Sequence, residues 1–147
     1  MTASVRQVLD EKGSRVHAVP PGASVYEALE LMAQHDIGAV VVAEGECLAG
    51  IFTERDYARK VILQGRTSRD TRVGELMTPN VLTVSPSQTM DDCMQLMTEN
   101  RVRHLPVVER GRLVGIVTIG DAVKTVIAEH EATIRQLSSY IAGDLAS

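Results

Sequence analysis

The chain has 147 residues, of which 44% are hydrophobic, and a formal net charge of −4. This length and apolar content suit one compact domain with a sizeable core. The negative charge argues against general binding to DNA, RNA or anionic lipid, and only 3% of the residues are aromatic, which leaves few side chains for base stacking. No apolar run is long enough to cross a bilayer and the first residues do not form a secretory signal, so we expect a cytoplasmic protein.

The two cysteines, Cys47 and Cys93, are too few for a disulfide framework, and neither belongs to a CxxC motif or a cluster with histidine. Cys93 occupies an apolar position of a predicted helix, and Cys47 lies near a predicted turn. We therefore expect two inert free thiols and no metal site, since a buried cysteine packs mainly as a small apolar residue.

An internal repeat organises the chain. A displacement of 65 residues aligns residues 19–61 with residues 84–126 without a gap. Self-similarity of this kind indicates a tandem repeat. The identical pairs are Val19/Val84, Pro21/Pro86, Leu31/Leu96, Met32/Met97, Val42/Val107, Glu44/Glu109, Leu48/Leu113, Gly50/Gly115, Ile51/Ile116, Thr53/Thr118, Asp56/Asp121 and Val61/Val126.

Each copy is predicted to start with a short strand before a proline, at residues 15–19 and 81–84. A helix follows, with Ser24 or Thr89 as the N-cap and an acidic residue three places on, Glu27 or Asp92. Its apolar residues recur at the spacing of one helix face, which predicts core packing: Val25, Ala28, Leu29 and Met32 in one copy, and Met90, Cys93, Met94 and Met97 in the other.

Two strands around a tight turn come next, at 39–43 and 48–52 and again at 104–108 and 113–117. Their continuous apolar character indicates strands covered on both faces. A second helix begins at Thr53 or Thr118, so the predicted order is β-α-β-β-α, twice. Short helices at 5–9 and 73–77 precede the copies, and the last helix continues beyond residue 126 because Ile127, Ile134, Leu137 and Ile141 keep a helical stripe.

The pattern that carries chemistry is Gly-Ile-Phe-Thr-Glu-Arg-Asp at residues 50–56, echoed by Gly-Ile-Val-Thr-Ile-Gly-Asp at residues 115–121. It lies where a strand meets a helix N-terminus, which suits phosphate, and the aspartate can accept hydrogen bonds from both hydroxyls of a ribose. Thr-x-x-Asp is also a capping pattern in which the acid returns to the backbone of the cap. Both interpretations stay open at this point.

Two β-α-β-β-α copies that each end in Gly-h-h-Thr-x-x-Asp (h, hydrophobic) resemble a CBS-domain pair, or Bateman module, of the stand-alone bacterial type. Leu105-Pro106-Val107-Val108 and Met77-Thr78-Pro79 add to the likeness. The resemblance implies an α/β (α+β) fold whose two repeats pack with pseudo-twofold symmetry. We divide the chain into repeat 1 (5–64), a linker with a short helix (65–78), repeat 2 (79–130) and a C-terminal helical extension (131–147).

The resemblance further implies two clefts for AMP, ADP, ATP or NAD-type ligands, with threonine on phosphate and aspartate on ribose. One cleft combines Thr53 and Asp56 with Leu82, Val102, Arg103, His104 and Pro106. The other combines Thr118 and Asp121 with His17, Ile37, Gly38 and Ala39.

The two clefts differ in their basic residues. The first gathers Arg55, Arg103 and His104, and arginine suits bidentate contacts with phosphate. The second has Gly120, Gly38 and Ala39 at the matching positions, so we expect it to prefer a less phosphorylated ligand or to stay empty. A solvated Arg103 and an interior His104 are the alternatives to these ligand roles.

We expect a regulatory module that senses adenine nucleotides, needs no cofactor and acts on a separate effector protein. Apolar residues on the helices after the motifs (residues 61–63, Val123, Val126 and Ile127) predict a symmetric homodimer. An enzyme is not expected, because the chain has no paired carboxylates, nucleophile elbow or metal cluster. The alternative function is a ligand-free dimeric adaptor in which both Thr-x-x-Asp motifs serve only as caps.

Overall fold

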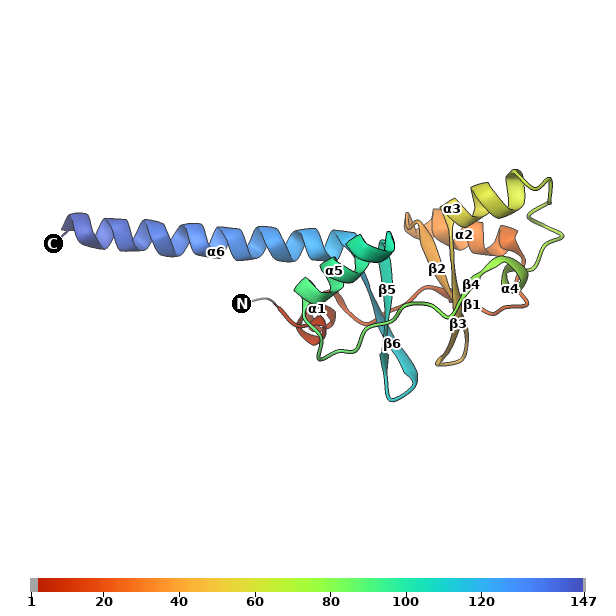
Figure 1. Ribbon diagram of the computed structural model, residues 1–147, viewed down its shortest axis with the longest axis horizontal. Helices are drawn as coiled ribbons and strands as arrows, with labels where there is room; N and C mark the ends of the chain where they lie inside the picture. Colours follow the sequence, from red (N-terminus) through yellow and green to blue (C-terminus); the bar gives the residue numbers. More distant parts are fainter. Residues whose placement is uncertain (1–2, 147) are drawn as a thin grey trace.

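The computed structural model describes residues 3–146 and the side chains of residues 3–139. Two units of similar build lie side by side, and the last helix projects from the second unit (Figure 1). Among the described residues, no helix is both long enough and apolar enough to cross a bilayer.

The first unit is a four-stranded sheet with helix α2 (Val25–His35) packed against it. β1 runs parallel to β2, and the remaining neighbours are antiparallel. In sheet order the strands are β1 (Ala18–Val19), β2 (Ala39–Glu44), β3 (Cys47–Thr53) and β4 (Thr78–Pro79). Five of the six residues of β2 are buried, which confirms the prediction of a strand covered on both faces.

The second unit repeats this plan with helix α5 (Met90–Asn100) and the antiparallel pair β5 (His104–Glu109) and β6 (Arg112–Thr118). Val84 pairs with Val107 as Val19 pairs with Val42 in the first unit. Strands β3 and β6 contact each other, and Leu113 N–H donates to the carbonyl of Glu46 at 2.8 Å. The predicted β-α-β-β-α repeat is therefore present twice.

The opening strands are shorter than predicted. The predicted strand at 15–19 is reduced to β1, and the predicted strand at 81–84 is reduced to a single bridge at Val84. The neighbouring strands extend past the observed pairs: in this register residues 16–17 would face Ala39 and Val40, and residues 82–83 would face Leu105 and Pro106. Each opening segment therefore leaves its neighbour before that strand ends, which local β-preference does not reveal.

The predicted helix caps are confirmed. Ser24 Oγ accepts the N–H of Glu27 at 3.1 Å. Thr89 forms a reciprocal capping box with Asp92, in which each side chain accepts the other's backbone N–H at 3.1 Å. These contacts satisfy backbone donors that the first turn of a helix leaves unpaired.

The helices after the two motifs differ in form. In the first unit α3 (Glu54–Asp56) passes into the π-helical turn η1 (Tyr57–Ile62). In the second unit α6 (Ile119–Ala146) is a continuous helix of 28 residues, which confirms that the last helix runs on. Of its predicted stripe, Ile141 lies outside the residues whose side chains are described.

Each unit is completed by the short helix that precedes the other unit. Helix α1 (Val5–Lys12) packs Val5, Val8 and Leu9 into the core of the second unit. Helix α4 (Val73–Leu76) packs Val73 into the core of the first unit. The backbone contacts match: Val5 N–H donates to the carbonyl of Gln88, and Val73 N–H donates to that of Ala23, both at 2.8 Å.

Two equivalent glycines allow these helices to approach closely. A Cβ atom at Gly50 would lie 2.7 Å from the backbone oxygen of Thr78 and from the sulfur of Met77. A Cβ atom at Gly115 would lie 2.8 Å from both terminal methyl carbons of Leu9. A side-chain end can rotate away, whereas a backbone oxygen held in a sheet cannot.

We therefore predict that Gly50→Ala destabilises the protein more than Gly115→Ala does. Overpacking of this kind costs about 1–3 kcal/mol, and we expect the Gly50 variant near the upper end of that range. Urea unfolding of both variants and the wild type measures the difference. Equal losses, or a larger loss for Gly115→Ala, would contradict this account.

Candidate functional site

The first Thr-x-x-Asp motif is a complete capping box at the junction of β3 and α3. Thr53 Oγ1 accepts the N–H of Asp56, and Asp56 Oδ2 accepts the N–H of Thr53, both at 3.0 Å. Asp56 Oδ1 lies 3.3 Å from Nζ of Lys60, which also donates to the carbonyl of Leu76. The side chain of Asp56 is half-buried, so its carboxylate is fixed yet accessible.

A cleft of about 590 Å³ opens beside this motif. Its walls come from both units: the end of β3 with α3, the segment after β4, and the corner between α5 and β5. The lining residues are Gly38, Ile51, Thr53, Glu54, Arg55, Asp56, Thr78, Asn80, Val81, Leu82, Arg101, Val102, Arg103 and His104.

The structure thus brings together seven of the eight residues predicted for the first cleft, Arg55 included. The exception is Pro106, which is buried in β5 and whose carbonyl accepts the N–H of Val84 at 3.1 Å. Pro106 thus joins β5 to the segment that opens the second unit, and it does not line the cleft.

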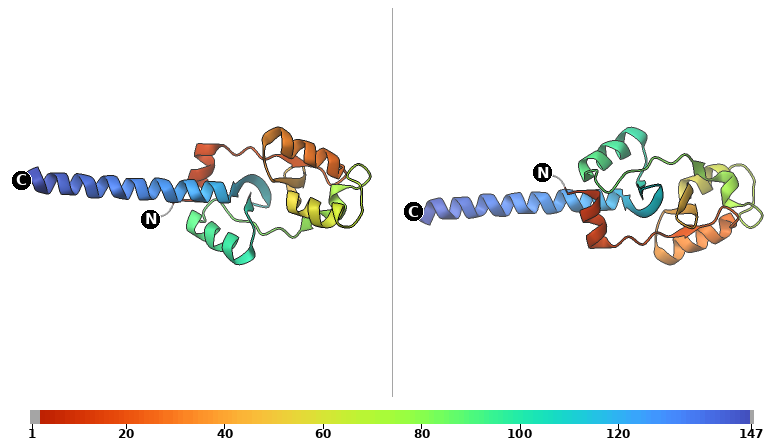
Figure 2. Two further views of the ribbon diagram at one scale, coloured as in Figure 1. Left: turned by 90° about the horizontal axis from the view of Figure 1, so that it is seen from above. Right: turned by 90° about the horizontal axis from the view of Figure 1, so that it is seen from below.

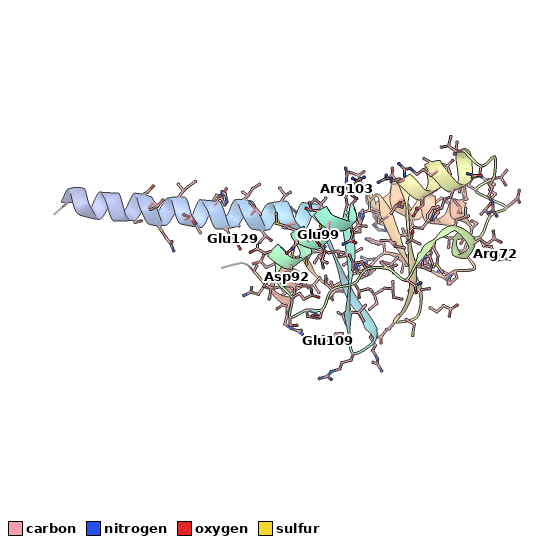
Figure 3. All side chains as sticks on the ribbon, viewed as in Figure 1. Arg72, Asp92, Glu99, Arg103, Glu109 and Glu129 are labelled. Atoms are coloured by element: carbon pink, nitrogen blue, oxygen red, sulfur yellow. The ribbon has the colours of Figure 1, made fainter. Side chains whose placement is uncertain are left out.

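The cleft carries three guanidinium groups and two carboxylates. Arg55, Arg101 and Arg103 are all exposed, and Arg103 projects where the second unit faces the first (Figure 3). Glu54 and Asp56 are the acidic residues. A cleft with both kinds of group can hold a ligand whose anionic part meets the arginines and whose hydroxyls meet Asp56.

His104 forms part of the wall and is half-buried. Burial lowers its pKa from the ordinary value, and the positive charges of Arg103 and Lys12 act in the same direction. The neutral form of His104 is therefore favoured, and a nearby anion would favour the protonated form instead.

The second Thr-x-x-Asp motif has the same capping box. Thr118 N–H donates to Asp121 Oδ2 at 2.9 Å, and Asp121 N–H donates to Thr118 Oγ1 at 3.3 Å. Asp121 Oδ2 also accepts a charged hydrogen bond of 2.7 Å from Nζ of Lys12, the last residue of α1. Lys12 donates in addition to the carbonyl of Ile116 at 2.9 Å, so it is held at two points.

Asp121 borders a hollow of about 320 Å³ between α1 and α6, and none of the four residues predicted to complete the second cleft lines it. Gly38 lies instead on the wall of the first cleft, where its carbonyl accepts the N–H of Glu54. Ala39 is buried opposite Thr53, and Ile37 packs on the core of the first unit.

His17 stacks on the ring of His35, with 3.8 Å between the ring centres. Burial lowers the pKa of His17, and the charges of His35 and Arg15 lower it further. The residues that the structure describes contain no group of three or more His, Cys, Asp or Glu side chains placed to bind a metal ion.

Sequence reasoning missed several residues of both sites. Glu54, Asn80 and Val81 line the first cleft, and nothing in their types or spacing marks them for that role. Arg101, two residues before Arg103, also lines this cleft and was not among the predicted site residues. Lys12 is separated from Asp121 by 109 residues, so no local pattern could have joined them.

The fold is a tandem α/β repeat with a cleft between its two units. The CBS-domain family model matches residues 5–62 and 73–128, and the chain belongs to that family. Our own division of the chain places the boundary of the second repeat later and stays a prediction.

Two curated relatives carry the same domain. The chain is 47% identical over 125 residues to the CBS domain-containing protein CBSX3, mitochondrial, of Arabidopsis thaliana, covering 82% of this chain and 61% of that protein. It is 39% identical over 114 residues to YhcV of Bacillus subtilis, covering 78% and 81% respectively. The chain thus spans less than two thirds of the plant relative.

Solved structures share the fold. A protein with CBS domains from Burkholderia ambifaria has a TM-score of 0.82 and 53% identity, with 86% of this chain and 95% of that chain covered. The CBS domain pair of protein MJ0100, solved with 5-methylthioadenosine and S-adenosyl-L-methionine, has a TM-score of 0.77 and 25% identity, with 88% and 99% covered.

The contact between Lys12 and Asp121 leads to a prediction. We expect Lys12→Met to lower the free energy of unfolding by about 1 kcal/mol, because a hydrogen-bonded ion pair between two partly buried groups is lost while the apolar stem is kept. Urea unfolding measures the change. Arg59→Met, which removes an exposed positive charge on η1, is the control and should be near neutral. Equal effects would show that the contact of Lys12 with Asp121 does not stabilise the fold.

Proposed function

We propose that the cleft beside Thr53 and Asp56 binds an adenine nucleotide, of the AMP, ADP, ATP or NAD type, and that binding regulates a separate effector protein. The observation that carries the proposal is the meeting of the Thr-x-x-Asp motif of one repeat with Arg103 and His104 of the other in one cleft. A ligand there contacts both repeats, so its binding can change how the two repeats are positioned relative to each other.

The orientation of the ligand follows from the charges. Asp56 accepts from the ribose hydroxyls, and the arginines face the phosphates. The complex of MJ0100 with two adenosyl compounds supports this class of ligand for a related domain pair. No catalytic role is part of the proposal: binding alone carries the signal.

Capping and ligand binding by Asp56 are compatible. One carboxylate oxygen already accepts the N–H of Thr53, while the other faces Lys60 at 3.3 Å. A carboxylate has about four lone-pair sites, so the capped group keeps capacity for ribose hydroxyls. The capping box fixes the carboxylate in the orientation that the ligand meets.

The two motifs are proposed to differ in ligand preference. In the first cleft Arg55, Arg101 and Arg103 are available to phosphate. At the second motif Asp121 is bound by Lys12, and the matching position of Arg55 is Gly120. The first cleft is therefore the site for the more phosphorylated ligand.

A symmetric homodimer is part of the same proposal. Large apolar side chains on the helices that follow the motifs are exposed in the single chain: Ile62, Leu63, Val123 and Ile127. Exposed apolar surface of this kind commonly marks an interface. A cytoplasmic location also stays a prediction; one relative is named as mitochondrial.

A ligand-free adaptor is the second candidate, because both Thr-x-x-Asp motifs form capping boxes in the absence of ligand. A thermal-shift screen with AMP, ADP, ATP, NAD and S-adenosylmethionine separates the two functions. A ligand at 100 times its dissociation constant adds about 2.7 kcal/mol to the free energy of unfolding. No stabilisation by any of the five compounds would favour the adaptor.

Asp56→Ala is predicted to weaken nucleotide binding by about 1.5–3 kcal/mol, because hydrogen bonds to a charged acceptor are lost. Loss of the cap costs stability as well, about 0.5–2 kcal/mol. Asp92→Ala is the matched control, since Asp92 forms the same capping box at Thr89, outside the cleft. Calorimetric titration should show weakened binding for Asp56→Ala alone. Unchanged affinity with reduced stability would assign Asp56 a capping role only.

Arg103→Ala is predicted to weaken ATP binding more than AMP binding, and adenosine binding least. Each charge-assisted contact is roughly twice as strong as a neutral one, so its loss scales with the phosphate contacts made. Titrations of the three ligands against wild type and Arg103→Ala test this prediction. Arg112→Ala is the control, because it removes the same charge at the start of β6, outside the cleft. Equal losses for all three ligands would show that Arg103 does not contact phosphate.

A further inference from the structure

Helix α6 carries an apolar stripe that this chain leaves uncovered. Ile119, Val123, Ile127, Ile134 and Leu137 follow one another at intervals of four, four, seven and three residues, and His130 divides the interval of seven into three and four. All five apolar side chains are between 41% and 61% exposed. From Val123 onward, with His130 included, the intervals alternate between four and three residues, as in the contact positions of a coiled coil, and Ile119 lies one position outside that register.

The stripe lies on the side of α6 that is turned away from the body. The opposite side is occupied: Ala122 is buried in the core of the second unit, and Glu129 Oε1 accepts the N–H of Ala3 at 3.2 Å. Figure 3 shows Glu129 on the side of α6 next to α1. Beyond Ala132, which still borders the hollow beside α1, the helix continues alone (Figures 1 and 2).

A helix in this position needs a partner. Isolated helices of fewer than about 12–15 residues are marginal in water, and most helical stability in proteins comes from packing an apolar face. The projecting part of α6 has such a face, and none of the other described residues packs against it. The stripe continues without a break from the part of α6 that lies on the body to the part that does not.

We propose that α6 pairs with α6 of a second copy of this chain, in antiparallel orientation. The stripe is self-complementary about a point between Ala128 and Glu129. Antiparallel pairing there sets Val123 against Ile134 of the second copy and Ile127 against His130. Leu137 of the second copy then lies beside Ile119 and Gly120, where the absence of a side chain leaves room for a large one.

The charges beside the stripe favour the same pairing. Lys124 and Glu131 flank it on one side, seven residues apart, and in the described part of the chain neither takes part in an ion pair. Antiparallel pairing brings Lys124 of each copy next to Glu131 of the other. Parallel pairing sets these residues beside Ile119 and Val126, which offer no charge.

A lipid surface fits the helix less well. Helices that lie on membranes carry lysine and arginine over their polar face. The polar residues of α6 up to residue 139 include Asp121, Glu129 and Glu131 as well as Lys124 and Arg135, so the face is mixed. The inference deepens the homodimer proposed above by naming the surface that forms it.

The first experiment compares two variants of the full chain by analytical ultracentrifugation. Ile134→Glu/Leu137→Glu places two charges in the stripe, and Gln136→Glu/Ser139→Glu places two charges away from it at equally exposed positions. We expect the stripe variant to weaken dimerisation at least 100-fold and the control to change it less than threefold. A stripe variant that stays as dimeric as the wild type, or a wild type that is monomeric, overturns the proposal.

A charge exchange tests the orientation. Lys124→Glu sets two like-charged pairs across the antiparallel interface and should weaken dimerisation several-fold. Adding Glu131→Lys restores opposite charges and should restore the affinity. Failure of the second change to rescue the first overturns the antiparallel arrangement.

The outcomes separate this inference from the proposals on which it rests. A stripe variant that remains dimeric leaves the homodimer intact and moves its interface to another surface, such as Ile62 and Leu63. Nucleotide binding, followed by AMP titration of the same variants, depends on a cleft remote from residues 134–137. Loss of dimerisation with AMP affinity retained shows that the variant is folded and that α6 alone was affected.

Discussion

The fold depends on an exchange of short helices between the two repeats. Helix α1 completes the core of the second unit and α4 completes that of the first, each through the same set of backbone hydrogen bonds. Separation of the units would expose Val5, Val8 and Leu9 on one side and Val73 on the other. The cleft has one wall from each unit, so this exchange also fixes its width.

Local features of the fold could be predicted, because their causes lie within a few residues. The caps at Ser24 and Thr89, the hairpins and the helices after Thr53 and Thr118 all follow from nearby residue types, and the structure confirms them. The limits of β1 could not be predicted, since they depend on where the segment leaves the neighbouring strand. The exchange joins residues 83 positions apart for α1 (Val5 and Gln88) and 50 positions apart for α4 (Val73 and Ala23), and it leaves no periodic signal.

The same distinction between local and long-range causes applies to the candidate site. The motif and the corner with Arg103 and His104 could be predicted from the repeat and its resemblance to a known family, and the structure places them around one cleft. The equivalent set around Asp121 could not be assessed from the sequence, because repeat symmetry predicts backbone positions and not the side chains that occupy them. Lys12 is an example: the equivalent contacts of Val5 and Val73 set α1 and α4 68 positions apart, so its counterpart is the uncharged Asn80.

The backbone explains how two similar clefts can diverge at little cost. Gly38 and Arg103 occupy equivalent positions, and the carbonyl of each accepts the first N–H of the following helix, at 3.0 and 2.9 Å. The structural contact is made by the main chain in both repeats, so the side chain is free to be a hydrogen atom in one and a guanidinium in the other. Ligand preference can therefore change here without changing the fold.

The ion pair between Lys12 and Asp121 has a thermodynamic consequence for the N-terminal helix. Oδ2 of Asp121 already accepts from Lys12 and from the N–H of Thr118, so a cation or hydroxyl-bearing molecule that takes this oxygen competes with the last residue of α1. Linkage makes such competition reciprocal. The free energy by which the bound molecule weakens the attachment of α1 equals the free energy by which the attachment of α1 weakens binding of that molecule. Helix α1 and the second motif are thus coupled through one carboxylate. A partner that binds the N-terminal helix would change the affinity of Asp121 for a ligand, although Asp121 lies 109 residues from Lys12 in sequence.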